Sequence, residues 1–177
     1  GIDYSRIQTS PAEEQKGVSH SMTLPRDYRK IEEIETVLLE LAEETCYRAR
    51  SIRKVGRVVH LYCQGADFNS PTSFSRQKTL FEPSAQAMDI YPSLRELFKT
   101  HWDGRAIRRL GVTLSQLVDA DRIQLSFFKN KEREMKLGRV MDDIRQRYGP
   151  TGIFRLSSLT SGGQFLECST RIGGHER

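Results

Sequence analysis

The chain has 177 residues, 37% of them hydrophobic and 29% charged, and it carries a formal net charge of +5. This balance is typical of a folded domain rather than a disordered chain, and no apolar run approaches the roughly 20 residues that a membrane span requires. Cys46, Cys63 and Cys168 are widely spaced and form no zinc-binding motif, so we expect reduced thiols in a cytoplasmic protein without a bound metal. The sequence begins at Gly1 with no Met and no secretory leader, from which we expect a fragment of a longer protein.

The first predicted elements are a linker and a strand. Residues 5–17 are polar and contain Pro11, which indicates a linker. Residues 18–24 then alternate, with small hydroxyl side chains on one face and a second face made of Val18, His20, Met22 and Leu24. We expect Pro25 to end this strand.

A long helix is predicted from about Asp27 to Ile52, with Asp27 as its N-cap. Its apolar positions recur every three or four residues, at Ile31, Ile34, Leu38, Leu41 and Thr45. Residues 31–44 hold six glutamates and no basic residue, and we expect these carboxylates to form a solvated face.

Two strands follow, in "RVVHLYC" and "SPTSFSRQKTL", and residues 84–101 return to a helical pattern that Pro92 either starts or kinks. "AIRRLGVTLSQL" predicts a fourth strand, and residues 131–148 predict one more amphipathic helix before a Gly- and Ser-rich tail. The order β-α-β-β-α-β predicts an α+β fold, in which two helices cover one face of a four-stranded antiparallel sheet, with a C-terminal helical extension.

The other face of this sheet is expected to be open and to carry small or basic residues. The residues assigned to it are Ser19, Ser21, Ser75, Arg76, Gln77, Lys78, Arg108 and Arg109. Small side chains let a phosphate approach backbone N–H groups, and arginines grip it with forked donors. Composition alone leaves a second interpretation open, in which these charges only guard a sheet edge against strand pairing.

Three motifs decide between these interpretations by resemblance. "QKGVSHSMTLPRDY", "SFSRQKTL" and "AIRRLGVTLSQL" resemble the little-finger domain of Y-family translesion DNA polymerases, in the UmuC/ImpB/MucB/SamB branch. The resemblance implies four segments: the end of the thumb and a linker (1–17), the little finger (18–119), a clamp-binding segment (120–130) and a C-terminal helix and tail (131–177). It also implies a bacterial protein of the SOS response to DNA damage, with primer-template DNA as its partner.

The resemblance places backbone contacts to DNA on three strands, at Val18, Ser19, His20, Ser75, Arg76, Lys78, Arg108 and Arg109. It also implies that the catalytic carboxylates and their Mg²⁺ ions belong to a palm domain that precedes these residues, so we expect no catalytic residue, metal or cofactor in this chain. Asp119 and Asp121 are the nearest carboxylate pair, and a turn explains them better.

"QLSFF" follows the fourth strand and resembles the family's peptide for the bacterial sliding clamp. The segment comprises Gln124, Leu125, Ser126, Phe127 and Phe128, with Phe127 in place of the usual leucine. Burying two or three such side chains is worth about 1.5–3 kcal/mol each before ordering costs. The alternative is that both phenylalanines pack under the following helix, and "QKTLF" at Gln77–Phe81 is a similar pattern inside a predicted strand.

Two other functions compete with this one. A single-stranded RNA-binding sheet of similar topology would need an aromatic pair on its central strands, and the residues assigned to the open face contain none. A protein-interaction module would use the acidic helix at 31–44 as its surface. The last helix either packs on the little finger or recruits an accessory protein, and the sequence does not separate these possibilities.

Overall fold

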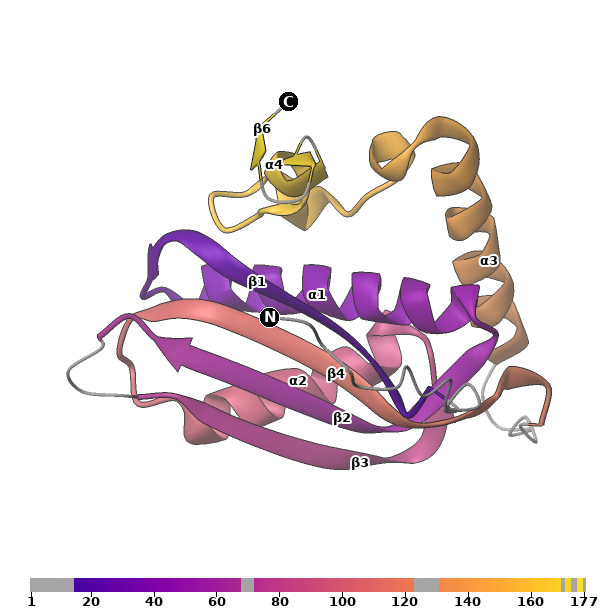
Figure 1. Ribbon diagram of the computed structural model, residues 1–177, viewed down its shortest axis with the longest axis horizontal. Helices are drawn as coiled ribbons and strands as arrows, with labels where there is room; N and C mark the ends of the chain where they lie inside the picture. The colour runs from indigo at the N-terminus through magenta and orange to yellow at the C-terminus, as the bar shows by residue number, and fades with distance from the viewer. Residues whose placement is uncertain (1–14, 68–71, 123–130, 170, 173–174, 177) are drawn as a thin grey trace, which may run out of the picture.

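The computed structural model describes residues 15–67, 72–122, 131–169, 171–172 and 175–176. Its main elements are β1 (Gly17–Tyr28), α1 (Ile31–Ser51), β2 (Lys54–Gly65), β3 (Phe74–Ser84), α2 (Ala87–His101) and β4 (Ile107–Asp119). The strands form one antiparallel sheet in the order β1-β4-β2-β3, and both helices lie on the same side of it (Figure 1). The predicted α+β fold is confirmed.

The core lies between this sheet and the two helices. The helical stripes predicted from the spacing of apolar residues are buried, and Leu38, Leu41, Leu94 and Phe98 are fully inaccessible to solvent. From the sheet, the alternate residues of each strand point into the same layer, as Leu61 does. Each such side chain contributes about 1.5–3 kcal/mol by leaving water.

The start of α1 differs from the prediction. Strand β1 continues through Pro25 to Tyr28, with a register irregularity against β4 between Thr23 and Tyr28. A proline is tolerated there because β1 is an edge strand that pairs only with β4. Asp27 therefore lies in the strand, and Lys30 stands at the N-cap without a side-chain cap bond.

Pro92 lies inside α2, five residues after the helix begins at Ala87, so it does not start the helix. Its ring is exposed, and its position removes one backbone donor from the first turns.

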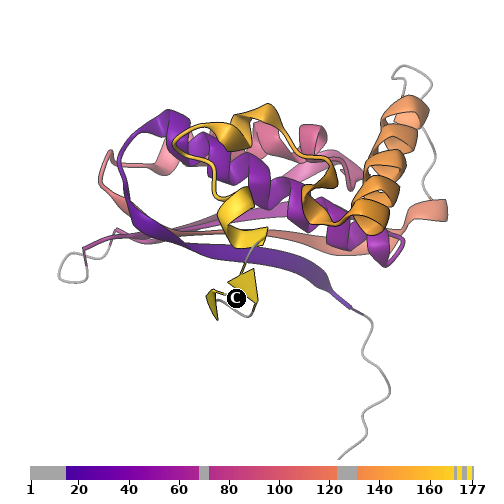
Figure 2. The same cartoon turned by 90° about the horizontal axis from the view of Figure 1, so that it is seen from above.

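The C-terminal extension continues from η1 (Ala120–Arg122) to α3 (Lys131–Tyr148), η2 (Pro150–Gly152), η3 (Leu156–Leu159), α4 (Phe165–Ser169) and the short strands β5 (Arg171–Ile172) and β6 (His175–Glu176). Residues 150–169, which we name the C-terminal strap, run over the outer side of α1 (Figure 2). Among the described helices, none is long and apolar enough to cross a membrane.

The strap contacts the glutamate side chains of α1. Glu43 accepts hydrogen bonds from Arg155 of the strap and from Arg145 at the end of α3. Glu40 accepts a hydrogen bond of 2.9 Å from the backbone N–H of Gln164. Burial raises the pKa of Glu40, although the hydrogen bonds from Ser158 and the strap backbone oppose this shift.

Near the start of α1, Glu33 pairs with Arg26 at 2.6 Å and accepts the Ser161 hydroxyl. Buried Tyr28 donates to the carbonyl of Gly162 and accepts from the Gln164 side chain. The expectation of a solvated glutamate face is therefore wrong for Glu33, Glu40 and Glu43, which contact the chain's own C-terminal segment, whereas Glu32 is exposed as expected.

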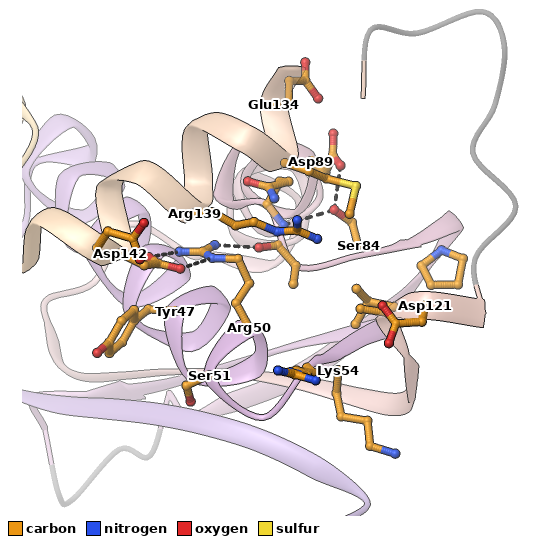
Figure 3. Close-up of a pocket in the computed structure, with 18 of the residues that line it drawn as sticks. Tyr47, Arg50, Ser51, Lys54, Ser84, Asp89, Asp121, Glu134, Arg139 and Asp142 are labelled. Atoms are coloured by element: carbon orange, nitrogen blue, oxygen red, sulfur yellow. Dashed lines mark hydrogen bonds and ion pairs between the residues drawn. The ribbon is translucent and has the colours of Figure 1, made fainter. Parts of the chain in front are cut away.

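Helix α3 is held both by the Arg145–Glu43 pair and by a second ion pair, which lies beside a cavity. Arg50 of α1 forms two hydrogen bonds of 2.7 Å with Asp142 and a third with the carbonyl of Ala85. The cavity has a volume of about 650 Å³ and is lined by residues of both charge signs, among them Lys54, Arg139 and Asp121 (Figure 3). Helix α3 thus packs on the domain, which was one of the two alternatives expected for it. Its contacts are chiefly polar.

Candidate nucleic-acid interface

The sheet face opposite α1 and α2 is covered by no helix in the described part of the chain (Figures 1 and 2). Strand pairing arranges its side chains in four cross-strand rows, since paired residues point to the same face. The rows, each read from β1 across β4 and β2 to β3, are Gly17–Ser115–Val58–Thr79, Ser19–Thr113–His60–Gln77, Ser21–Gly111–Tyr62–Ser75 and Thr23–Arg109–Gln64. We name these residues the open face.

Small hydroxyl side chains dominate the open face, and Arg109 is the one arginine or lysine in its four rows. The Arg109 guanidinium lies 3.3 Å from the hydroxyl of Ser21 on the neighbouring strand. The two groups together offer a phosphate a forked charged donor and a neutral donor within one small area. This part of the predicted site is brought together by the fold.

Backbone N–H groups contribute less to this face than we expected. Strand β4 is paired along its length with both β1 and β2, so its amides are used within the sheet. On the outer edge of β1, the carbonyl of Ser19 accepts a bond from Arg48 of α1 at 3.1 Å. A phosphate above the centre of the open face therefore meets hydroxyls and Arg109 rather than free amides.

Arg76 and Lys78 do not point to the open face. They pair with Leu61 and Val59, which are buried under the helices, and the Lys78 ammonium contacts Glu96 of α2 at 2.5 Å. We expected all four residues of "SRQK" on one face, but successive side chains of a strand point to opposite faces. Only Ser75 and Gln77 therefore lie on the open face.

Arg108 lies at an irregularity of β4. The register between β2 and β4 shifts between Gln64 and Gly65, and Arg108 is the β4 residue that this shift leaves without a partner. Its guanidinium pairs with Asp27 at 3.3 Å, at the rim of the sheet. Arg108 can approach a ligand from this rim, whereas Arg109 lies on the open face itself.

Val18 and His20 belong to the buried side of β1, as the alternation predicted. Val18 is 6% exposed, and its side chain is part of the core. Burial lowers the pKa of His20, and Arg48 lowers it further, while Glu44 partly opposes the shift. A contact of either residue with DNA would have to use the main chain.

Two ring side chains of the open face, His60 and Tyr62, were missed from the sequence. Both lie on β2, a central strand, and the His60 ring is 2.9 Å from the hydroxyl of Ser115. Their signal was available in "RVVHLYC", where they alternate with Val59, Leu61 and Cys63 of the buried face. We expected no aromatic residue on this face, and Tyr62 corrects that expectation.

The predicted clamp-binding residues Gln124, Leu125, Ser126, Phe127 and Phe128 lie outside the described residues. They stand between η1, which ends at Arg122, and α3, which begins at Lys131. The similar pattern "QKTLF" lies in β3, as expected, with Leu80 buried and Phe81 94% exposed.

Carboxylates and thiols show no arrangement for metal binding in the described ranges, where no group of three or more His, Cys, Asp or Glu residues converges. Asp119 ends β4 and pairs with Lys54 at 2.8 Å, and Asp121 lies in the η1 turn. Burial raises the pKa of the Cys46 thiol to about 12 and also raises that of Cys63.

Comparisons with curated proteins match nearly the whole chain. It is 50% identical over 176 residues to a DNA polymerase IV 2 of Bacillus subtilis and 45% identical over 175 residues to a DNA polymerase IV 2 of Halalkalibacterium halodurans. It is also 40% identical over 177 residues to a putative UV-damage repair protein UvrX of Bacillus subtilis. Each match covers 99% of the chain, but the chain spans only 42–43% of these relatives' own length.

Solved structures show more distant likenesses. An insertion ternary complex of Dbh DNA polymerase matches with 17% identity and a TM-score of 0.49, over 58% of this chain and 29% of that one. A complex of the beta-clamp processivity factor with the little finger domain of PolIV matches with 16% identity and a TM-score of 0.46, over 64% of this chain and 99% of that one.

One family description matches the region that holds the sheet and its two helices. It is the impB/mucB/samB family C-terminal domain, and the match runs from residue 15 to residue 127, which is more than half of the chain. The family expected from the strand motifs is confirmed, and the chain belongs to the impB/mucB/samB family, whose C-terminal domain it contains.

Proposed function

We propose that this chain is the part of an error-prone translesion DNA polymerase that holds the DNA backbone and binds a bacterial sliding clamp. The observation that carries the first half is the open face, a helix-free sheet of hydroxyl side chains around Arg109, in a domain of this family. The names of the relatives, a DNA polymerase and a UV-damage repair protein, support the same activity for the parent protein.

DNA would lie across the open face with its phosphates near Ser19, Ser75 and Arg109. Arg108 would reach it from the rim beside β1, and Arg76 and Lys78 only from the free edge of β3. Contacts of this kind follow a backbone without reading bases, so binding would be independent of sequence and strongly dependent on salt. The Mg²⁺-binding carboxylates would belong to the parent's palm, and such a protein would work in the cytoplasm.

The acidic helix favours this function over a protein-interaction module. The surface that such a module would use is occupied within the chain, since Glu33, Glu40 and Glu43 bind the C-terminal strap or its neighbouring arginines. Glu35 likewise pairs with Arg95 and Lys99 of α2.

The DNA contact is tested by the salt dependence of binding to a labelled duplex, measured by fluorescence anisotropy. Because each neutralised phosphate contributes about 0.9 to the slope of log affinity against log salt, Arg109→Ala should flatten that slope by about one. Arg95→Ala is the matched control, since it removes an exposed arginine from α2 on the opposite side of the sheet. An Arg109→Ala slope equal to that of the unchanged chain would remove this face from the interface.

The clamp contact rests on the sequence pattern and its place after β4, and it needs its own test. We expect the chain to bind a bacterial sliding clamp with a dissociation constant in the micromolar range, about −8 kcal/mol. Changing Gln124, Phe127 and Phe128 to alanine should abolish this binding, because the side chains that fill the clamp pocket are lost. The measurement is a fluorescence titration.

The chain provides a matched control for this triple variant in "QKTLF". Gln77→Ala with Phe81→Ala removes the same residue types from β3, where Phe81 makes almost no packing contact. Clamp binding that survives the triple change, or that is lost equally in the control, would disprove the assignment to Gln124–Phe128. A triple variant that fails to bind and also melts earlier would place these phenylalanines in the core.

A further inference from the structure

The geometry points to a second use of the open face: we propose that Tyr62 is a stacking platform for one unpaired base of single-stranded DNA. This inference rests on the proposed function for its ligand class and adds to it a binding mode that duplex DNA does not need. The proposal depends on how the Tyr62 ring lies, on what surrounds it, and on the position of the nearest cation.

The Tyr62 ring lies along the sheet rather than standing away from it. Its hydroxyl donates to the side chain of Gln64 at 3.1 Å, and Gln64 is two residues further along the same strand on the same face. Successive residues of one face are about 7 Å apart along a strand, so this bond draws the ring over the sheet surface. With 37% of the residue exposed, the ring is left partly open to solvent.

The neighbours of Tyr62 leave room for a flat ligand. The residues beside it in its row are Ser21, Gly111 and Ser75, so the ring is the one large side chain of that row. At Gly111, an added Cβ would come within 3.2 Å of the Ser21 Cβ and 3.6 Å of the Tyr62 Cβ. Glycine at this central position therefore adds no side chain between Ser21 and Tyr62, which already approach each other over β4.

Arg109 lies in the adjoining row, directly across from Gln64. A nucleotide whose base rests on Tyr62 would have its phosphate toward this guanidinium and the Ser21 hydroxyl, which already lie within 3.3 Å of each other. A ring that accepts a base and a cation that accepts the adjacent phosphate are the two components of sequence-tolerant single-strand binding. Base pairs inside a duplex have both faces covered by their neighbours, so the platform selects unpaired bases over these.

The experiment compares two labelled probes, an oligo(dT) single strand and a blunt duplex of mixed sequence, by fluorescence anisotropy with the complete chain. Tyr62→Ala should weaken oligo(dT) binding by about fivefold or more, the range found when a base-stacking aromatic is removed. Tyr62→Phe, which keeps the ring and loses the bond to Gln64, should retain most of that affinity. Binding of the blunt duplex should change less than twofold in both variants, and the salt slope should stay constant because no charge is removed.

A second variant guards against a loss of folding. Tyr62→Leu keeps an apolar side chain larger than that of alanine but without a π-face, and it should weaken oligo(dT) binding as Tyr62→Ala does, while the melting temperature stays that of the unchanged chain. Equal oligo(dT) affinity for all variants, or an equal loss on both probes, would overturn the proposal. If the unchanged chain binds the duplex but Tyr62 has no effect, only the platform fails. If it binds neither probe, the proposed function fails with it.

Discussion

His20 shows how one residue's side of a strand decides what it can contribute. His20 lies within "QKGVSHSMTLPRDY", one of the motifs that carry the family resemblance. Its side chain nevertheless points to α1, where burial and then Arg48 lower its pKa. The imidazole is therefore neutral near pH 7, and it faces away from the side of the sheet where phosphates would lie. Arg109, next to the β4 irregularity at Arg108, is the residue that carries charge to that side.

The lowered pKa of His20 predicts a pH dependence of stability. Because the unfolded chain, with a pKa near 6.5, binds the proton more readily than the folded chain, the free energy of unfolding should fall as the pH drops below about 6.5. His20→Gln should show a smaller fall between pH 7.5 and pH 5.5, measured from urea unfolding midpoints. Parallel curves for the two proteins would show that His20 is not responsible.

At the scale of elements, α3 is joined to α1 by two ion pairs, Arg145 with Glu43 and Asp142 with Arg50. The second pair lies beside a cavity, and the side chain of Arg50 is 17% exposed and that of Asp142 12% exposed. Removing one partner of a buried ion pair costs about 3–5 kcal/mol, because the other charge stays buried without compensation. The docking of α3 therefore depends on two carboxylates, Asp142 and Glu43.

We expect Asp142→Ala to loosen α3, which then keeps only the Arg145–Glu43 pair, while leaving the sheet folded. Amide hydrogen exchange should accelerate throughout α3, whereas the amides of β2 and β4 should keep their protection. Asp143→Ala is the matched control, since this neighbouring carboxylate is exposed. Unchanged exchange in α3 of the Asp142 variant, or equal acceleration in the sheet, would show that the ion pair does not hold the helix.

For the whole molecule, the parts predictable from the sequence were those in which apolar residues recur at the spacing of a strand or a helix. Alternation and helical spacing gave the element order and most of the core, because each pattern has one face that must leave water. "SRQK" contains no apolar residue to indicate which side faces the core. The face on which Arg76 and Lys78 lie therefore followed only from the residues with which β3 pairs. The end of β1 differs from the expectation because Pro25 lies in an edge strand, which tolerates a proline.

The acidic face of α1 could not be assigned from the sequence for a different reason. The partners of Glu40 and Glu43 are Arg145, Arg155 and the backbone of Gln164, all more than one hundred residues away along the chain. Local composition distinguishes a solvated glutamate from a paired one only when the partner is near in sequence. The small, polar character of the open face was predictable, but assigning His60 and Tyr62 to it required the strand register.

The bonds from Tyr28 to Gly162 and Gln164 join residues 134 and 136 positions apart. During synthesis on the ribosome, the sheet and its two helices are complete once β4 has emerged, but Glu33, Glu40 and Glu43 must wait for the strap. Contacts this distant in sequence raise the contact order of the chain and form late. A nascent chain would thus spend the time needed to translate about fifty further residues, a few seconds at bacterial rates, with its acidic helix uncovered.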